Sequence, residues 1–166
     1  LPPVIFGALS QIMPERVIAD CGSPLWNVYF AGHQPSGRRF VKMFFMNGGH
    51  GARPHQDGPA CLSFPSNVAT VPIEQFESSV PLLITEKSLI PDSGGAGRFR
   101  GGPAQRVSFK VVSDQPVSMT IRHERVRFPP RGLLGGLPGA AGRDYVNGKR
   151  IPGKAQVDLQ PNDVVT

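Results

Sequence analysis

The 166-residue sequence has few of the residues that mark disulfide-linked, zinc-binding or membrane-spanning proteins. Its two cysteines, Cys21 and Cys61, lack CxxC spacing, which argues against a disulfide framework or a zinc knuckle and favours a reducing compartment. No run approaches the roughly 18 apolar residues of a membrane span, and the N-terminal stretch LPPVIFGALSQIM lacks the basic region of a signal peptide. We therefore expect a cytoplasmic protein without a membrane partner.

Aromatic residues are also scarce, at 8% of the chain. The stretch RHERVRF at 122–128 allows a nucleic-acid surface as an alternative interpretation, but basic and aromatic residues are not interleaved as in a recognisable RNA or DNA module. The net charge of +6 comes from thirteen arginines against five lysines, and arginine suits the recognition of carboxylates and phosphates. We expect no nucleic-acid partner, although anionic ligands fit this composition.

Glycine and proline are abundant, at 20 and 18 residues, and this favours short strands joined by defined turns. We expect one domain over residues 1–166 that is mainly β, either a twisted antiparallel sheet or a β-sandwich, with one or two short helices. Apolar spacing predicts a helix over 3–13, and Pro72 begins a second helix of one or two turns. Strands are expected at 16–20, 25–31, 39–47, 81–90, 105–113 and 116–122, and Asn147-Gly148 predicts a hairpin turn. The run VKMFFMN at 41–47 is apolar on both sides, which predicts burial on both faces.

Two stretches of eleven residues, GGHGARPHQDG at 48–58 and DSGGAGRFRGG at 92–102, hold nine of the glycines. Neither contains the GxxxxGK[ST] loop of nucleotide-binding proteins or the GxGxxG dinucleotide fingerprint. Arginines beside glycines form a reasonable cradle for an anion, because a ligand can approach the backbone closely there. The alternative is structural: the glycines supply turns with positive φ, and Asp92 pairs with Arg98.

Other kinds of site have weaker support in the sequence. His50, His55 and Asp57 lie close together, but no HExxH spacing is present, and Asp57-Gly58 also fits a simple turn. There is no GxSxG elbow around a serine nucleophile, and both cysteines are expected to be small core residues. His123 begins a polar cluster with Glu124 and Arg125 at a predicted strand end, where the alternative is a solvated ion pair.

Four motifs in order, GGHGARPHQDG, PIEQFESSVP, PDSGGAGRFRGG and RFPPRGLLGG, resemble the B-type subunit of the hydantoinase B/oxoprolinase family. The patterns GGxGARPxxDG and DSGGAGRxRGG are both complete. The resemblance covers essentially the whole chain, but family chains are several times longer. It therefore implies a C-terminal fragment of a longer hydantoinase B-like chain.

The resemblance implies ATP-dependent opening of a cyclic amide, such as 5-oxoproline, hydantoin or N-methylhydantoin, or in related members the carboxylation of a ketone. It further implies an oligomer in which ATP is bound mainly by a separate A-type subunit. A divalent metal is compatible with this chemistry, and we assign no metal ligand in this chain. The alternative is an assembly module that docks subunits while the chemistry takes place elsewhere.

Phosphorylation of the amide oxygen would let water attack the carbonyl carbon, which requires positioned cations and a group that orients or deprotonates water. The catalytic candidates are Asp57, Arg53, Glu74, Glu77 and His123. The candidates for binding substrate or an anion are Gly49, Gly51, Asp92, Gly94, Gly95, Arg98 and Arg100.

Overall fold

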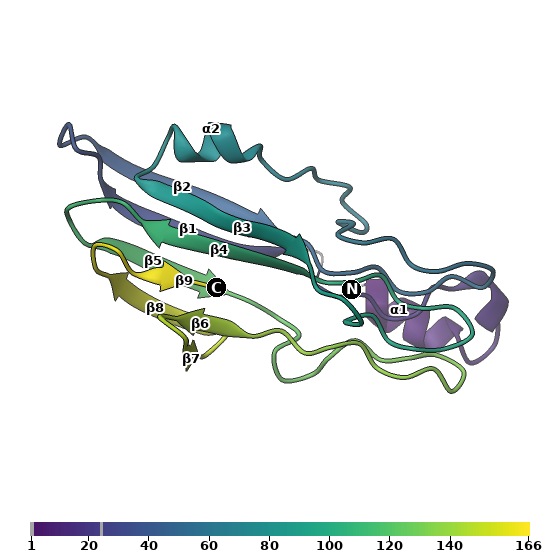
Figure 1. The fold of residues 1–166 in the computed structure, drawn as a ribbon. Coiled ribbons are helices and arrows are strands. Elements are labelled where there is room, and N and C mark those ends of the chain that lie inside the picture. Colours follow the sequence, from purple (N-terminus) through teal and green to yellow (C-terminus); the bar gives the residue numbers. More distant parts are fainter. Residues whose placement is uncertain (1, 24) are drawn as a thin grey trace.

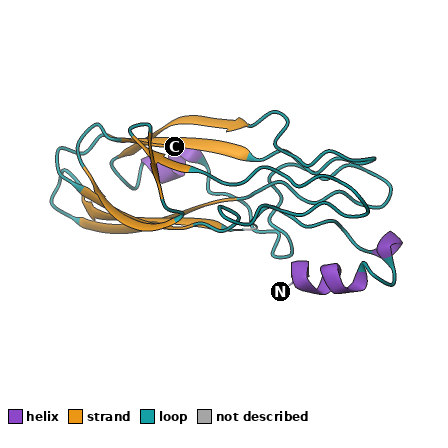
Figure 2. Cartoon of the chain, turned by 90° about the horizontal axis from the view of Figure 1, so that it is seen from below, coloured by secondary structure: helices purple, strands orange, loops and turns teal. Residues whose placement is uncertain are grey.

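The computed structural model describes residues 2–23 and 25–166. The fold is mainly β, as expected, with strands in two antiparallel sheets and two short α-helices among the described residues. The first sheet contains, in spatial order, β2 (Arg39–Met46), β1 (Trp26–His33), β5 (Val117–Arg122) and β8 (Lys154–Leu159). The second contains β3 (Leu82–Leu89), β4 (Gln105–Val111), β9 (Val164–Val165), β6 (Asp144–Val146) and β7 (Lys149–Ile151). Figure 1 labels these strands, and Figure 2 shows them in two layers at one end of the molecule.

The core lies between the two sheets and is built from alternating strand residues. Along β5, Val117, Met119 and Ile121 are buried, and the residues between them face outward, as the two-residue period predicts. Aromatic side chains join the layers: the ring of Phe109 on β4 lies 5.3 Å from Phe30 and 5.2 Å from Phe44 of the first sheet. The sandwich is therefore held by interdigitated side chains, as in other two-sheet proteins.

Helix α2 (Ile73–Glu77) closes the sandwich along the side formed by β2 and β3 (Figure 1). Its Phe76 is fully buried and contacts the rings of Phe30, Phe44 and Phe109. The helix follows Pro72, as predicted, since proline fixes a φ that suits the start of a helix.

The hairpin predicted at Asn147-Gly148 is confirmed and joins β6 to β7. Asn147 has a φ of 50° and Gly148 a φ of 75°, the paired positive values of the tight turn that matches strand twist.

Two local predictions were wrong, and a third was right about a helix but not about its length. No strand forms at 16–20, where the short 3₁₀ helix η1 (Pro14–Arg16) is followed by an irregular segment that bonds to a glycine-rich loop rather than to a sheet. The N-terminal helix, α1 (Pro2–Leu9), is shorter than 3–13, and none of its described side chains is buried. β2 is not buried on both faces: Phe40, Phe44 and Met46 pack in the core, but Val41, on the outer face of the sheet, is 74% exposed. At eight residues, α1 is the longest helix in the described part of the chain, and no helix there is long and apolar enough to cross a bilayer.

Candidate functional site

The glycine-rich stretches lie beyond one end of the sandwich, where they run alongside each other without forming strands (Figure 2). Backbone hydrogen bonds connect the stretches to one another and to the segments 17–23 and 130–142. The bonds, each 2.8 or 2.9 Å long, run from Ala19 to Ala52, Gly22 to Gly49, Gly102 to His50, Gly58 to Arg100, Leu137 to Ala96 and Ala140 to Ser93, donor first. We call these four segments (17–23, 48–60, 92–104 and 130–142) the glycine bundle.

Close backbone contact explains why glycine occupies so many positions of the bundle. A Cβ atom at Gly49 would lie 1.8 Å from the carbonyl oxygen of Gly102, and one at Gly94 would lie 1.9 Å from that of Gly101. The interpretation that these glycines supply positive φ was wrong, because the described glycines with positive φ are Gly37, Gly135 and Gly148, outside both stretches. Residues 48–58 and 92–102 therefore hold each other through backbone contacts that any side chain would block.

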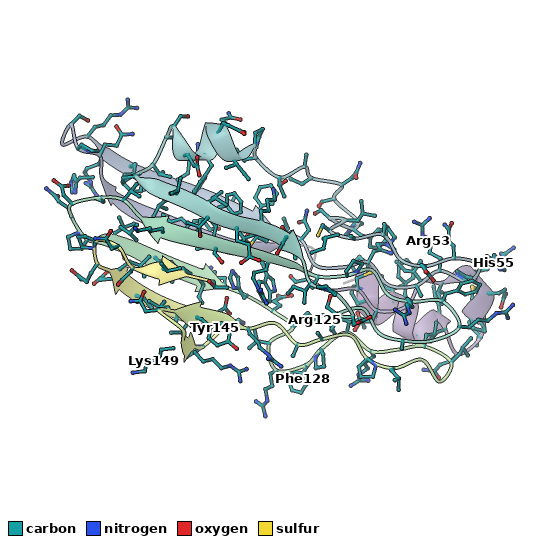
Figure 3. All side chains as sticks on the ribbon, in the orientation of Figure 1. Arg53, His55, Arg125, Phe128, Tyr145 and Lys149 are labelled. Atoms are coloured by element: carbon teal, nitrogen blue, oxygen red, sulfur yellow. The ribbon has the colours of Figure 1, made fainter. Side chains whose placement is uncertain are left out.

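A cleft of about 750 Å³ lies between the glycine bundle and the adjoining end of the sandwich. Strands of both sheets contribute Trp26, Met46, Val107 and Tyr145 to its wall, and residues of the glycine bundle, among them the candidates Arg53, Asp92 and Arg98, form most of the rest. Arg125 lies where the strands end and the loops begin (Figure 3). A concave space lined by apolar side chains and a few polar groups is the usual form of a small-molecule site.

His123 and Asp144 form a buried pair beside this cleft. His123 directly follows β5, and its Nδ1 lies 2.6 Å from Oδ1 of Asp144 at the start of β6. The ring of Trp26 stacks on the imidazole with centroids 4.3 Å apart and planes 6° from parallel. Within the described part of the chain, Nε2 of His123 and Oδ2 of Asp144 are buried without a hydrogen-bond partner. A carboxylate that fixes one imidazole nitrogen leaves the other to exchange a proton, as in many catalytic pairs.

A second ion pair, between Arg125 and Asp20, lies on the same cleft. Nη2 of Arg125 is 2.5 Å from Oδ1 of Asp20, and both side chains are largely buried. Asp20 Oδ2 also accepts the backbone N–H of Arg131 at 3.2 Å. The alternative of a solvated ion pair among His123, Glu124 and Arg125 is therefore wrong, because His123 and Arg125 each pair with an acid from a distant segment.

The candidates in residues 48–58 bond mainly within the bundle. Asp57 is exposed, and its Oδ1 accepts the backbone N–H of Arg100 at 2.8 Å. His50 is buried, with Nδ1 2.8 Å from the carbonyl oxygen of Gly51. Arg53 begins a tight turn closed by its N–H to Gln56, and its buried Nε has no partner among the described residues.

The charged candidates in residues 92–102 lie on the surface. Asp92 pairs with Arg100 at 3.4 Å, with 88% and 65% of these side chains exposed, so the pairing of Asp92 with Arg98 was not correct. The guanidinium of Arg98 instead lies over the ring of Phe99, 5.5 Å from its centroid. Ion pairs as exposed as that of Asp92 contribute little to stability.

Glu74 and Glu77 lie on α2, at the opposite end of the molecule from Arg53 and His55 (Figures 1 and 3). Glu77 Oε1 accepts the backbone N–H of Ile84 at 2.7 Å, which ties α2 to β3. Glu74 is exposed. The structure therefore does not bring these two carboxylates to the cleft or to the glycine bundle.

The two cysteines have protonated, poorly nucleophilic thiols. Burial raises the pKa of Cys21, although a hydrogen bond from the Gly51 N–H to its Sγ at 3.3 Å acts in the opposite direction. Burial likewise raises the pKa of Cys61, which is only partly buried. The prediction of a core cysteine is confirmed for Cys21.

Among residues 2–23 and 25–166, no three or more His, Cys, Asp or Glu side chains are grouped so that they could hold a metal ion. The pair of His123 and Asp144 offers two ligands at most.

Sequence reasoning missed Asp20, Trp26 and Asp144 as members of the site. Asp20 meets Arg125 across 105 positions of sequence, and Asp144 meets His123 across 21. No local motif marks these residues. The sequence offered only an indirect signal: Trp26 at the start of a strand and the acids Asp20 and Asp144 beside turns had no expected partner nearby in the sequence.

Comparison with known proteins places this structure in context. The chain is 37% identical to an uncharacterized protein of Methanocaldococcus jannaschii over 98% of this chain and 28% of that protein. It is 40% identical to the caprolactamase subunit beta of Pseudomonas jessenii over 63% of this chain and 19% of that subunit. The crystal structure of the ATP-dependent caprolactamase from Pseudomonas jessenii superimposes with a TM-score of 0.77 and 26% identity, covering 95% of this chain and 30% of that one.

The chain thus spans less than a third of the length of these relatives. The family model for hydantoinase B/oxoprolinase matches residues 1–166, the whole of the sequence. This match agrees with the motifs now located in the glycine bundle and with the sandwich shared with the caprolactamase. The chain belongs to the hydantoinase B/oxoprolinase family.

Proposed function

We propose that this chain is the C-terminal part of a B-type subunit in an ATP-dependent enzyme that opens a cyclic amide, and that it works with an A-type subunit. The observation that carries the proposal is the whole-chain family match, together with 40% identity to a caprolactamase beta subunit. ATP would be bound mainly by the A-type subunit, and phosphorylation of the amide oxygen would make the ring carbonyl open to attack by water.

Within this reaction, His123 is the described residue best suited to orient or accept a proton from the attacking water. Its Nδ1 is held by Asp144 and its ring by Trp26, so Nε2 keeps one direction. Among the sequence candidates, it alone combines burial with a carboxylate partner, and Asp144 and Trp26, which contact its ring, both line the cleft. Local opening of the site would be needed for water to reach Nε2, because that atom is buried.

A second function, assembly without chemistry, is favoured by the contacts of the other candidates. Asp57, Glu77 and Asp92 all use their carboxylates in bonds within the fold, and Asp92 and Arg100 are largely solvent-exposed. In this alternative the glycine bundle is a scaffold that positions surfaces for the remainder of the longer chain or for a partner subunit.

Turnover of ATP by the full-length B-type chain mixed with its A-type subunit tests both functions. The rate of ATP hydrolysis would be measured without a substrate and with 5-oxoproline, hydantoin or caprolactam. A separate measurement with acetone and bicarbonate tests ketone carboxylation. Stimulation by a cyclic amide, with release of the ring-opened product, supports the proposal. Stimulation only by the ketone and bicarbonate would replace it with a carboxylase.

The variant His123→Asn separates a chemical role from a structural one. The Asn amide can still donate a hydrogen bond to Asp144, but it has no group equivalent to Nε2. We expect a fall in kcat of about 100-fold or more if Nε2 transfers a proton, with little change in KM or in binding to the A-type subunit. Asp57→Asn is the parallel test of the exposed candidate, because its remaining oxygen can still accept the Arg100 N–H. Loss of turnover there with full activity in His123→Asn would assign the proton transfer to Asp57 instead. Full activity in both variants would leave the assembly function as the better account.

A further inference from the structure

The positive charge of the chain is concentrated in one part of the sequence. Residues 122–154 contain eight Lys and Arg and two Asp and Glu, a net charge of +6 that equals the net charge of the whole chain. One of the two acids, Asp144, is buried against His123, and one of the eight cations, Arg125, is paired with Asp20. The other seven cations are exposed and form no ion pair with any described residue.

Five of these cations lie on strands and turns that adjoin at one corner of the sandwich. Arg122 at the end of β5 is paired in register with Lys154 at the start of β8. A Cβ at Gly153, next to Lys154, would lie 2.6 Å from Val126, whose chain neighbour is Arg127. Lys149 and Arg150 lie on β7, the edge strand joined to β8 through the turn at 152–153. We call Arg122, Arg127, Lys149, Arg150 and Lys154 the basic corner.

Two features of the basic corner favour contact with another protein over simple solvation. Like charges directly opposite each other on neighbouring strands destabilise a sheet, so the pair Arg122 and Lys154 has a cost that an anionic partner would remove. Phe128 is 68% exposed beside Arg127, whose guanidinium lies 5.2 Å from the ring centroid. Exposed aromatic and arginine side chains together are typical of protein interfaces.

The corner is also close to the candidate site. Arg122 immediately precedes His123, and Figure 3 shows Phe128 and Lys149 along the lower side of the molecule. The two sheets end on that side in β7 and β8, whereas α2 covers the side formed by β2 and β3 (Figure 1). A protein bound to the basic corner would therefore approach the end of the sandwich where His123 and the cleft lie.

We propose that the basic corner docks an acidic surface of the A-type subunit. This inference rests on the proposed function, because it takes the ATP-binding subunit as the partner. Charge complementarity of this kind accelerates association and fixes orientation, and its effect falls as salt screens the charges.

The dissociation constant of the full-length B-type chain and its A-type subunit tests the docking surface. For the wild type, we expect Kd to rise steadily as NaCl increases from about 50 to about 300 mM. The double variant R122E/R150E should bind about tenfold or more weakly at the lowest salt and lose most of the salt dependence. R38E/R39E is the matched control: it carries the same change of charge on exposed residues at the β1–β2 hairpin, the far end of the first sheet from Arg122. It should bind within about twofold of the wild type.

The single variant Arg122→Glu guards against a loss of binding caused by misfolding. It places a negative charge opposite Lys154, so its Tm is expected to equal or exceed that of the wild type while its affinity falls. Wild-type affinity in R122E/R150E would overturn the docking surface, as would an equal loss in R38E/R39E. If R122E/R150E keeps its affinity for the A-type subunit but loses the wild type's binding to a 20-nucleotide single-stranded RNA, the basic corner is a nucleic-acid surface instead. Failure of the wild-type subunits to form a complex would overturn both this inference and the proposed function. A complex that is weakened in R122E/R150E, but whose ATP turnover no cyclic amide stimulates, would overturn the proposed function alone.

Discussion

The sandwich and the glycine bundle reach close packing by opposite means. In the sandwich, Phe30, Phe44, Phe76 and Phe109 fill the space between two sheets, so the strands stay apart and side chains supply the contacts. In the bundle, carbonyl oxygens lie where a Cβ would be, so the chains touch directly and side chains are excluded. A glycine-rich motif that identifies a family can therefore reflect backbone packing as well as ligand binding.

The difference also changes how the two regions respond to substitution. Removing atoms from the sandwich leaves a cavity, whereas adding a single atom to the bundle forces backbone segments apart. The following three predictions test this contrast, from the largest expected effect to the smallest.

Phe109→Ala is expected to have the largest effect, a loss of about 3–5 kcal/mol in the free energy of unfolding. Its ring contacts Phe30, Phe44 and Phe76, so truncation removes contacts with both sheets and with α2. Urea denaturation followed by circular dichroism measures the change. A loss below about 1 kcal/mol would show that the sandwich does not depend on this aromatic cluster.

Gly49→Ala is expected to lower the free energy of unfolding by about 2–3 kcal/mol, because its Cβ would lie 1.8 Å from the Gly102 carbonyl oxygen. Gly7→Ala is the matched control, since nothing lies within 4 Å of the added atom and alanine favours the helix that contains it. Fluorescence of Trp26, the one tryptophan of the chain, reports unfolding where the bundle meets the sandwich. Equal stability of the two variants would contradict backbone packing as the reason for the glycines.

The smallest effect concerns pH, and it arises in the bundle at Cys21. Burial raises the pKa of its thiol above the ordinary value of 9.0, so the folded state holds the proton more tightly than the unfolded state does. The resulting stability is present below the unfolded pKa and is lost as pH rises through the folded pKa. The free energy of unfolding of the wild type should therefore fall more steeply above about pH 9 than that of Cys21→Ala. Denaturation curves that change in parallel from pH 7 to pH 10 would show that Cys21 does not contribute, because all other titrating groups are shared.

Predictions from sequence succeeded where the determining contacts are local. The period of two along 117–122 and the Asn147-Gly148 turn were confirmed because strand alternation and positive φ depend on neighbouring residues alone. The strand expected at 16–20 failed because the hydrogen bonds of this segment go to residues 49 and 52, a choice that no local propensity encodes. Burial of β2 on both faces failed for a related reason: only the packing of the two sheets decides which face of β2 meets the core.

The candidate site shows the same division. From sequence, Arg53, Asp57 and Arg98 were chosen because they lie beside glycines, and those choices remain predictions that a turnover experiment must decide. The pair of His123 and Asp144 emerged only when β5 and β6, from different sheets, met at the end of the sandwich. Trp26 and Asp20 were likewise absent from the sequence candidates because their partners, His123 and Arg125, are about 100 positions away.

By itself, the sequence determined the family, the mainly β composition and the places of the turns, since these follow from motifs and from the conformational limits of single residues. Tertiary structure alone decided that the glycine stretches pack on each other, that His123 and Arg125 separate into two ion pairs, and that five cations gather at one corner. The physical reason is that close backbone approach, burial of charge and clustering of like charges all depend on which distant segments become neighbours. Such contacts are set by the packing of the whole chain, not by the preferences of its parts.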